Sequence, residues 1–374
     1  MRISLRALNR TYLRRQLLVG AGSRTVADVV RRVVAVQAQE VDAPYVGVWA
    51  RLDEFGHAQL IQALHDRSVV RGGLLRGTQH LCVAADYLWM RPLLARRMGN
   101  FGLSAFRRQL EGVDLAELTQ HARDVLAGRT MTRPQLARAL AEWYPGRETI
   151  ALAWAAQHQL ALVHPPPSGI WRRRGHVHVA LAEDWIGAPL EKEAGEGGEG
   201  VEGTARRDAH VQELFRRYLA GCGPATAADF QNWSGLRRVR EEVEAMRAQL
   251  RVYVDDAGRE LFDLPELELA DPDEDDAVPV RFLPEFDNLV LSHEDRSRII
   301  REPGDRALIC PGYSIVRPTF LEDGFVAGTW TVERGTLEVQ PFRPLRDPAA
   351  VVAEGERLLA FLEEGQGADR VRIR

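Results

Sequence analysis

One order of predicted elements recurs three times along this chain of 374 residues, and the repeat limits the folds that the chain can adopt. In each copy the hydrophobic spacing predicts three helices followed by two short strands around a turn. The copies are predicted at residues 4–20, 26–37, 57–66 and 68–83, then at 114–126, 132–143, 149–160 and 162–179, and finally at 205–219, 223–233, 236–250 and 252–262. Three helices before a hairpin is the layout of a winged helix. We therefore expect an α+β fold, mainly helical, with three tandem winged-helix units.

The rest of the chain sets the expected domain boundaries. A β-rich pattern begins near residue 279, with a predicted strand at 307–310 and a closing helix at 349–364. The segment 301–306, between two predicted strands, is interpreted as a hairpin that can probe DNA. We expect winged helix 1 at residues 1–112, winged helix 2 at 113–187, an acidic, glycine-rich linker at 188–203, winged helix 3 at 204–282 and a β-rich C-terminal region at 283–374.

Composition excludes several classes of protein. Apolar residues make up 45% of the chain and charged residues 27%, which is typical of soluble globular proteins. No apolar run reaches the roughly 18 residues of a membrane span, and the N-terminus has no signal-peptide pattern. The three cysteines lie far apart, without metal-binding spacing. We expect a cytoplasmic monomer with no metal, no cofactor, no membrane contact and no protein partner.

The charges are unevenly distributed. Residues 1–190 hold 25 arginines against 15 acidic residues, whereas the remainder holds 24 basic and 38 acidic residues. A basic N-terminal half suits a polyanion such as DNA, although solvated arginine-rich helix faces would give the same count. Of the 49 basic residues only Lys192 is a lysine, and it lies in the acidic linker. A mechanism through a lysine Schiff base is therefore not expected.

Two glutamines, Gln37 and Gln39, lie where the second predicted helix runs out before Pro44. On a continuing helix their side chains would point about 200° apart. If both amides serve one site, the backbone must leave the helix between them or just after them. Taken by residue type alone, they can equally be two solvent-exposed glutamines at a helix end.

Three stretches of the sequence together resemble the AlkZ-like tandem winged-helix DNA glycosylases. This family comprises the azinomycin-crosslink glycosylase and related self-resistance glycosylases. The stretches are Val-Gln-Ala-Gln at residues 36–39 with the segment 43–51, Leu-Leu-Arg-Gly-Thr-Gln-His at 74–80, and the run 283–298 with the segment 323–330. The resemblance covers essentially the whole chain. It implies that Gln37 and Gln39 are the catalytic pair, because that family uses a Gln–apolar–Gln motif. Glutamine at the second position, where the housekeeping branch has Asp, implies the antibiotic self-resistance branch.

The resemblance implies a substrate and a chemistry. The partner would be double-stranded DNA carrying guanine alkylated at N7, as a bulky adduct or an interstrand crosslink. Alkylation makes the base a cation that departs as a neutral group, so the acid half of glycoside hydrolysis is already accomplished. Glutamine amides can orient water and present oxygen to the developing sugar cation, but they are not bases. Glu40, Asp42 and Asp287 are the sequence-level candidates for a general base.

Further residues are candidates for DNA contact. Arg76, Thr78 and His80 alternate on a predicted strand and would share one face, as DNA contacts or as a structural hydrogen-bonded cluster. Arg172, Arg173 and Arg174 lie at a predicted wing tip, where they would straddle phosphates or form a solvated loop. Asn288, His293 and Arg296 lie in the stretch 283–298, and His293 is equally consistent with a core histidine. We expect these residues to border an open basic cleft with the glutamines on its floor.

Two other functions are consistent with parts of the sequence. A tandem winged-helix regulator without catalytic activity would need a polar recognition helix, but the predicted helix 149–160 is mostly Ala, Leu and Trp, and we expect it to be buried. A metal-dependent nuclease would need clustered ligands. Its best candidate is the acidic run 271–276, which reads better as a solvated linker.

Overall fold

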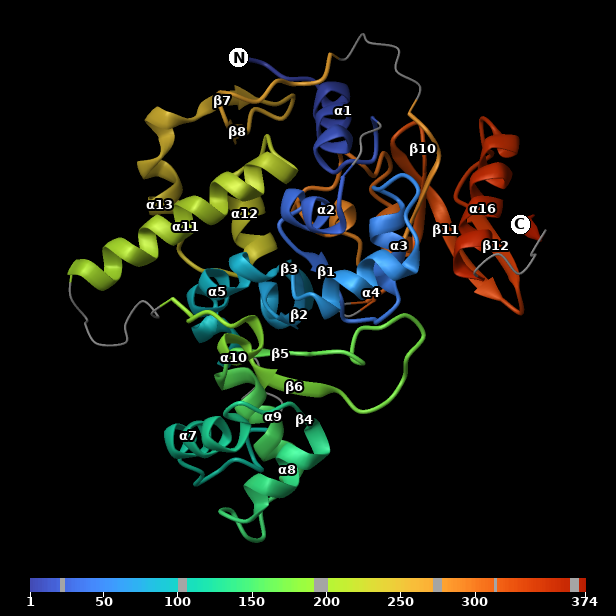
Figure 1. Ribbon diagram of the computed structural model, residues 1–374. Helices are drawn as coiled ribbons and strands as arrows, with labels where there is room; N and C mark the ends of the chain where they lie inside the picture. The colour runs from blue at the N-terminus through green and yellow to red at the C-terminus, as the bar shows by residue number, and fades with distance from the viewer. Residues whose placement is uncertain (21–23, 100–105, 192–200, 272–277, 313–314, 364–369) are drawn as a thin grey trace.

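The computed structural model describes residues 1–20, 24–99, 106–191, 201–271, 278–312, 315–363 and 370–374 (Figure 1). Its elements form a mixed α+β fold with a six-stranded, a five-stranded and a two-stranded sheet, which confirms the predicted fold class. Most of the acidic linker, including Lys192, and nearly all of the acidic run 271–276 lie outside the described residues. None of the described helices combines the length and apolar character that a membrane span requires.

The first unit has the element order of a winged helix. Its elements are α2 (Val26–Arg32), β1 (Val36–Gln37), α3 (Ala43–Trp49), α4 (His57–His65), β2 (Val69–Gly73) and β3 (Gln79–Val83), with α1 (Leu5–Arg15) before them and α5 (Ala84–Leu93) after them. A 3-10 turn, η1 (Leu75–Gly77), connects β2 to β3. β3 lies between β1 and β2, so β1 is an edge strand of this sheet. The helix predicted at residues 4–20 is too long, because α1 ends at Arg15.

The second unit repeats this order and shares a sheet with the first. It contains α7 (Leu115–Leu126), β4 (Met131–Thr132), α8 (Arg133–Ala141), α9 (Thr149–Gln159), β5 (Leu162–Val163), β6 (His178–Leu181) and α10 (Ala182–Ile186). β5 pairs with β2 at Val163 and Gly72, so the six strands run β1-β3-β2-β5-β6-β4. Most of α9 is buried, as predicted, which disfavours it as a reader of a DNA groove.

The third unit follows the linker. It contains α11 (Val201–Cys222), α12 (Ala227–Ser234), α13 (Arg240–Ala245), the 3-10 turn η2 (Arg247–Gln249), β7 (Arg251–Val254) and β8 (Glu260–Asp263). A bridge from Ala225 to Phe262 occupies the place of the short first strand. The single helix predicted at 236–250 is in fact divided between α13 and η2.

The C-terminal region is built on the five-stranded sheet, in the order β13-β12-β11-β10-β9. Its elements are β9 (Arg281–Leu283), α14 (Asn288–Leu291), α15 (Asp305–Ile309), β10 (Thr319–Glu322), β11 (Phe325–Glu333), β12 (Thr336–Pro341), α16 (Pro348–Leu362) and β13 (Val371–Ile373). The prediction of a strand at 307–310 is wrong, since these residues lie mostly in α15. The segment 301–306 leads into that helix and is not a hairpin between two strands.

One large core joins the first unit, the third unit and the C-terminal region. Phe215 and Tyr218 of α11 pack against Phe230 and Trp233 of α12, and the same cluster includes Leu289. The helices of the second unit bury a separate cluster, and Figure 1 shows them at one end of the molecule. The predicted domain boundaries remain a proposal, because the shared core and shared sheet cross them.

Candidate active site

Gln37 lies on the extended backbone of β1, and Gln39 lies two residues further on, in a bend. α2 ends at Arg32, and Val34 then adopts a left-handed φ of 70° that turns the chain into β1. The prediction of helix up to Gln37 is therefore wrong. Gln37 pairs with His80 across the ladder, and the Ala38 amide continues it by donating to the Gln79 carbonyl at 2.8 Å. Both glutamines therefore lie beside the start of β3, with Gln37 opposite His80 and Gln39 bound to the Gln79 amide.

Arg76 fixes the orientation of the Gln37 amide. The Gln37 side chain is 7% exposed, and its Oε1 accepts a hydrogen bond of 2.8 Å from Nη2 of Arg76. Nη1 of the same guanidinium donates to the Trp233 carbonyl at 2.7 Å, which ties the first unit to α12. A guanidinium has donors only, so the amide oxygen must face it. The two N–H donors of Gln37 and one oxygen lone pair remain for another partner.

Gln39 differs from Gln37 in its exposure. It lies exposed beyond the last residue of β1, and its Oε1 accepts a long hydrogen bond of 3.4 Å from the Gln79 amide. The pair therefore combines one nearly buried, clamped amide with one at the surface.

Arg71 holds the peptide between the two glutamines. Its Nε and Nη2 donate to the Ala38 carbonyl at 3.0 and 2.9 Å, and its Nη1 lies 2.7 Å from Nδ1 of His164. Burial lowers the pKa of Arg71 to about 10, with a further contribution from Arg133. The sequence reasoning missed Arg71 and His164. The one available signal was an arginine within the apolar strand at 69–73.

Arg76, Thr78 and His80 do not lie on one strand as predicted, because β3 begins only at Gln79. Arg76 is in the η1 turn with a left-handed φ of 55°. Burial lowers its pKa to about 10, with the charge of Arg296 next in size. Thr78 donates to the Leu75 carbonyl at 3.2 Å. His80 is 1% exposed, and burial, followed by the charge of Arg76, lowers its pKa to about 3.

The three wing arginines lie beside the loop that follows Gln39. All three side chains are exposed in the long connection between β5 and β6. Asp42 accepts hydrogen bonds from the Arg172 amide at 2.8 Å and from Nη2 of Arg174 at 2.7 Å. Tyr45 also donates to the Gly169 carbonyl at 3.0 Å. The wing of the second unit is thus anchored next to the glutamines, and Arg172, Arg173 and Arg174 remain proposed DNA contacts.

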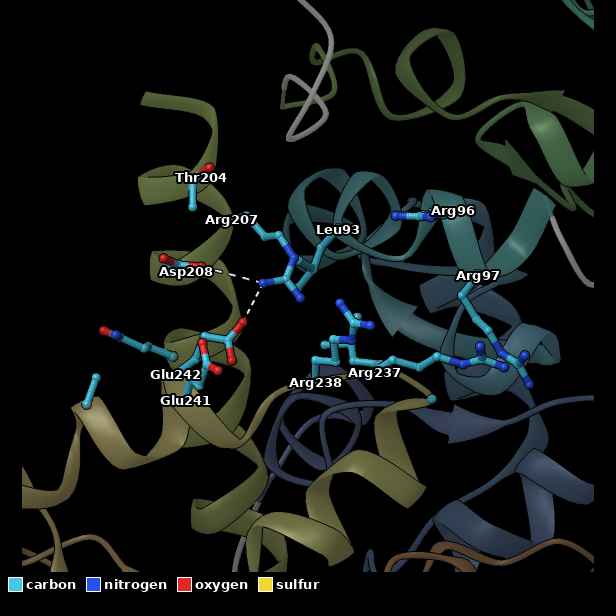
Figure 2. A pocket seen from close by; sticks show the side chains of 14 residues that line it. Leu93, Arg96, Arg97, Thr204, Arg207, Asp208, Arg237, Arg238, Glu241 and Glu242 are labelled. Carbon is cyan, nitrogen blue, oxygen red and sulfur yellow. Dashed lines mark hydrogen bonds and ion pairs between the residues drawn. The ribbon is translucent and has the colours of Figure 1, made fainter. Parts of the chain in front are cut away.

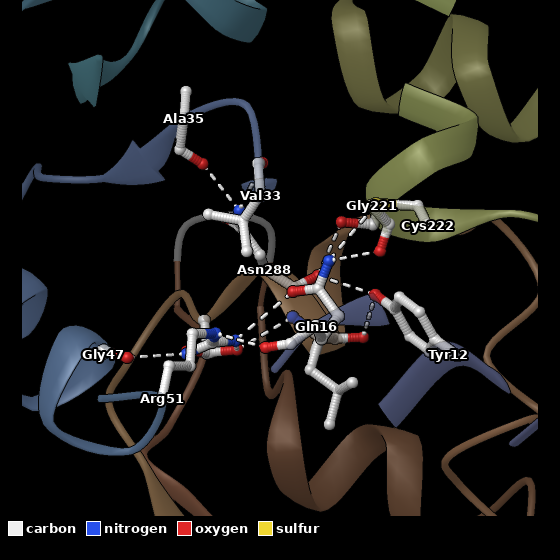
Figure 3. A network of polar contacts seen from close by, with 12 residues as sticks. Tyr12, Gln16, Val33, Ala35, Gly47, Arg51, Gly221, Cys222 and Asn288 are labelled. Carbon is white, nitrogen blue, oxygen red and sulfur yellow. Dashed lines mark hydrogen bonds and ion pairs between the residues drawn. The ribbon is translucent and has the colours of Figure 1, made fainter. Parts of the chain in front are cut away.

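Hydrogen bonds inside the protein engage the side chains of Asn288 and His293. Nδ2 of Asn288 donates to the carbonyls of Val33 and Ala35, at 3.3 and 2.6 Å, which holds the turn before β1 (Figure 3). His293 is 2% exposed, and its Nε2 lies 3.0 Å from the Cys222 carbonyl. These two predictions are therefore corrected to structural roles.

Arg296 lies closer to the site. It is half-buried, donates to Sγ of Cys310 at 3.1 Å, and lies near enough to Arg76 to lower the pKa of that residue. It therefore remains a proposed DNA contact.

Of the four carboxylates near the site, two are bound within the protein and two remain candidates for a general base. Asp287 is buried in a bidentate ion pair with Arg51, and Asp42 is bound to the wing, so neither is a good base. Glu40 is exposed next to Gln39. Glu285, which the sequence reasoning missed, lies near it. Burial, followed by the negative charge of Glu40, raises the pKa of Glu285.

Within the part of the chain that the structure describes, no three His, Cys, Asp or Glu side chains come close enough together to hold a metal ion. The three cysteines are free thiols, and Cys82 and Cys222 are buried. The polar groups near the glutamines are amides, guanidinium groups, a hydroxyl, a neutral imidazole and the carboxyl groups of Glu40 and Glu285. Amide and guanidinium N–H groups in such a set can donate hydrogen bonds to a water.

Acid should destabilise this part of the molecule through its buried histidines. Burial lowers the pKa of both His80 and His164, so on acidification the unfolded state takes up protons first. The contribution of the two neutral histidines to the free energy of unfolding is complete above pH ~6.5. It is lost as the pH falls toward the pKa values that the histidines have in the folded protein. As the pH falls from about 7.5 to about 5.5, His80 should lower the free energy of unfolding by about 1.4 kcal/mol. Urea unfolding of His80→Gln should show a pH dependence smaller by that amount.

His65 offers the matched control for this measurement, because it is exposed at the end of α4. His65→Gln should leave the pH dependence of the unfolding free energy unchanged. If His80→Gln and the unmodified chain lose the same stability on acidification, His80 is not held neutral in the folded protein.

The repeated order of helices and strands, and a site of amides and arginines, are consistent with a protein that acts on DNA. The chain belongs to the DNA glycosylase AlkZ-like family, whose model matches residues 30–361. It is therefore a DNA glycosylase, a hydrolase acting on N-glycosyl bonds.

Individual relatives agree with this assignment. An interstrand DNA cross-link repair glycosylase of Streptomyces sahachiroi is 24% identical, and the match covers 100% of both chains. The solved structure of the Streptomyces sahachiroi DNA glycosylase AlkZ matches the fold with a TM-score of 0.80 at 24% identity, again over 100% of each chain.

Proposed function

We propose that this enzyme hydrolyses the N-glycosidic bond of guanine alkylated at N7 in double-stranded DNA, as a bulky adduct or an interstrand crosslink. The observation that carries the proposal is the arrangement of Gln37 and Gln39, which both contact the start of β3 while Arg76 holds the Gln37 amide by a hydrogen bond. The family assignment supplies the reaction class, and the named relative acts on interstrand cross-links. The lesion and a role in self-resistance to an alkylating antibiotic are our proposal.

The proposed chemistry needs little acid or base. An N7-alkylated guanine is already cationic and leaves as a neutral base, so the enzyme has to position water against an oxocarbenium-like sugar. Gln37 and Gln39 offer N–H donors and oxygen acceptors beside the start of β3, and the charge of Arg76 polarises the Gln37 amide. His80 is neutral there and cannot act as an acid at neutral pH. Glu40 and Glu285 are the carboxylates that remain to assist the water.

The reaction we propose is monofunctional, without a covalent enzyme intermediate. The intermediate of a bifunctional glycosylase is a Schiff base, which needs an amine nucleophile. The α-amino group of Met1 lies 3.4 Å from the Val252 carbonyl in the third unit, away from the glutamines. The one lysine, Lys192, lies in the linker sequence outside the described residues. Water is then the nucleophile, and we propose that the enzyme acts as a monomer.

A base-release assay tests the proposal. Duplexes carrying single N7-alkylguanine adducts of increasing bulk are incubated with the enzyme and then heated in alkali, which breaks strands at abasic sites. We expect strand breaks at the adducted guanine and no protein–DNA adduct after borohydride reduction. Intact strands across the panel would leave a DNA-binding protein without this activity, and a borohydride-trapped adduct would contradict the monofunctional mechanism.

A further inference from the structure

A cavity of about 780 Å³ opens between the end of α5, the N-terminal half of α11 and the segment from α12 to α13 (Figure 2). It lies where the first and third units meet. Neither Gln37 nor Gln39 lines it, so it is distinct from the candidate active site. Its volume is in the range of cavities that hold small ligands.

The charges of the cavity are segregated onto two sides, as Figure 2 shows. On one side Arg207 forms ion pairs with Glu242 and, at 3.5 Å, with Asp208, and Glu241 lies beside them. This cation is already neutralised by acidic neighbours. The side therefore offers no free positive charge to a ligand.

The other side carries four arginines. These are Arg96, Arg97, Arg237 and Arg238, and none forms an ion pair with a carboxylate of the described chain. Arg97 is half-buried, and its Nε is buried without a hydrogen-bond partner among the described residues. Among the described residues these four like charges have no carboxylate partner, which is unfavourable unless an anion joins them.

The cavity is connected to the candidate active site through Arg76. Gly235 lines the cavity and has a left-handed φ of 76°. A Cβ at this glycine would lie 3.0 Å from Cα of Arg76, so the two backbones are in close contact. The guanidinium of Arg76 in turn binds Oε1 of Gln37. A single residue therefore separates the cavity from the clamped glutamine.

We propose that this cavity binds the phosphodiester backbone of DNA adjacent to the lesion. The inference rests on the proposed function and adds a second contact region, on the third winged-helix unit. Guanidinium groups pair with phosphate oxygens through two parallel hydrogen bonds, and four of them can contact consecutive phosphates along a strand. Binding there would hold DNA against Arg76 and so keep the sugar of the lesion opposite Gln37 and Gln39.

Binding of undamaged duplex DNA at several salt concentrations tests this inference, using the full chain and fluorescence anisotropy. The double variants Arg96→Gln/Arg97→Gln and Arg237→Gln/Arg238→Gln should each bind at least about tenfold more weakly. The slope of log affinity against log salt should fall by about 0.9 for each phosphate that an arginine no longer neutralises. This readout does not depend on base release, so it can succeed or fail independently of the proposed reaction.

The matched control is Arg129→Gln/Arg138→Gln, which removes two exposed arginines from the second unit. We expect its salt slope to stay closer to that of the unmodified chain. Unchanged affinity and slope in both cavity variants would overturn the inference. So would binding of a free mononucleotide at micromolar concentration that the cavity variants abolish while they still bind DNA normally, because the cavity would then be a nucleotide site.

Discussion

Replacing Gln37 by alanine should lower the rate constant for base release from an N7-alkylguanine duplex by about 100- to 1000-fold. This is the effect of removing one pre-oriented polar group from a hydrolytic site. The reason is the hydrogen bond that Arg76 donates to Gln37. Arg76 holds the Gln37 oxygen at 2.8 Å, so the remaining donors and lone pair of this amide need no reorganisation when water binds. Single-turnover rates at saturating enzyme measure the effect separately from DNA affinity.

The matched control for this prediction is Gln62→Ala, the same substitution at an exposed position of α4. It should leave the rate of base release unchanged. DNA affinity should be similar for Gln37→Ala and the unmodified enzyme, because Gln37 is nearly buried. A Gln37→Ala enzyme that releases base at the normal rate would remove the clamped amide from the mechanism.

Replacing Asp287 by alanine should lower the free energy of unfolding by about 3–5 kcal/mol, the usual cost of leaving a buried ion without its partner. Arg51 and Asp287 form two hydrogen bonds of 2.8 and 2.7 Å, and both side chains are 2% exposed. Arg51 also donates to the carbonyls of Gln16 and Gly47 (Figure 3). The pair thus joins α1, α3 and the C-terminal region directly behind the candidate active site. Urea unfolding measures the loss.

An exposed ion pair supplies the comparison. Arg31 and Asp28 are 3.5 Å apart on α2, with about half of each side chain exposed to solvent. Arg31→Ala should cost less than about 1 kcal/mol. If Asp287→Ala costs no more than Arg31→Ala, the buried network is not what holds these three regions together.

The repeated order of elements could be read from the sequence because it depends on local patterns. Hydrophobic spacing and turn residues recur in each winged-helix unit, and they are sufficient to place most of the helices. The extended backbone at Gln37 was not predictable in this way. The valines that continue the helical spacing of α2 belong to a turn, because Asn288, more than 250 positions further along the chain, binds the carbonyls of Val33 and Ala35.

The candidate site was only partly predictable for the same reason. The motif residues Gln37 and Gln39 and their neighbour Arg76 were found from sequence, and the structure brings Gln37 and Arg76 into contact. Asn288 and His293 were assigned to DNA because polar residues in a shared motif suggest a surface, but tertiary packing buries both. Arg71 and Glu285 were missed, since their significance comes from the position of Ala38 and Glu40 in space.

The strand wrongly predicted at 307–310 shows that local sequence preference alone does not always decide between a strand and a helix. Its residues, Ala-Leu-Ile-Cys, are compatible with either a strand or a helix, and a short apolar run cannot be assigned by periodicity alone. In the structure Asp305 begins α15 and forms an ion pair with Arg343, a contact that crosses from another part of the C-terminal region. Long-range packing therefore decides between the two states.

The central claim is that the two amides of Gln37 and Gln39, beside the start of β3, act together on a single water molecule. A double-mutant cycle over Gln37→Ala and Gln39→Ala, followed by single-turnover base release from a duplex with one N7-alkylguanine, tests this claim most directly. We expect each single variant to lose most of the activity and the double variant to lose little more, since residues that act as a unit are not additive. Fully additive losses, or normal release by the double variant, would contradict a shared role.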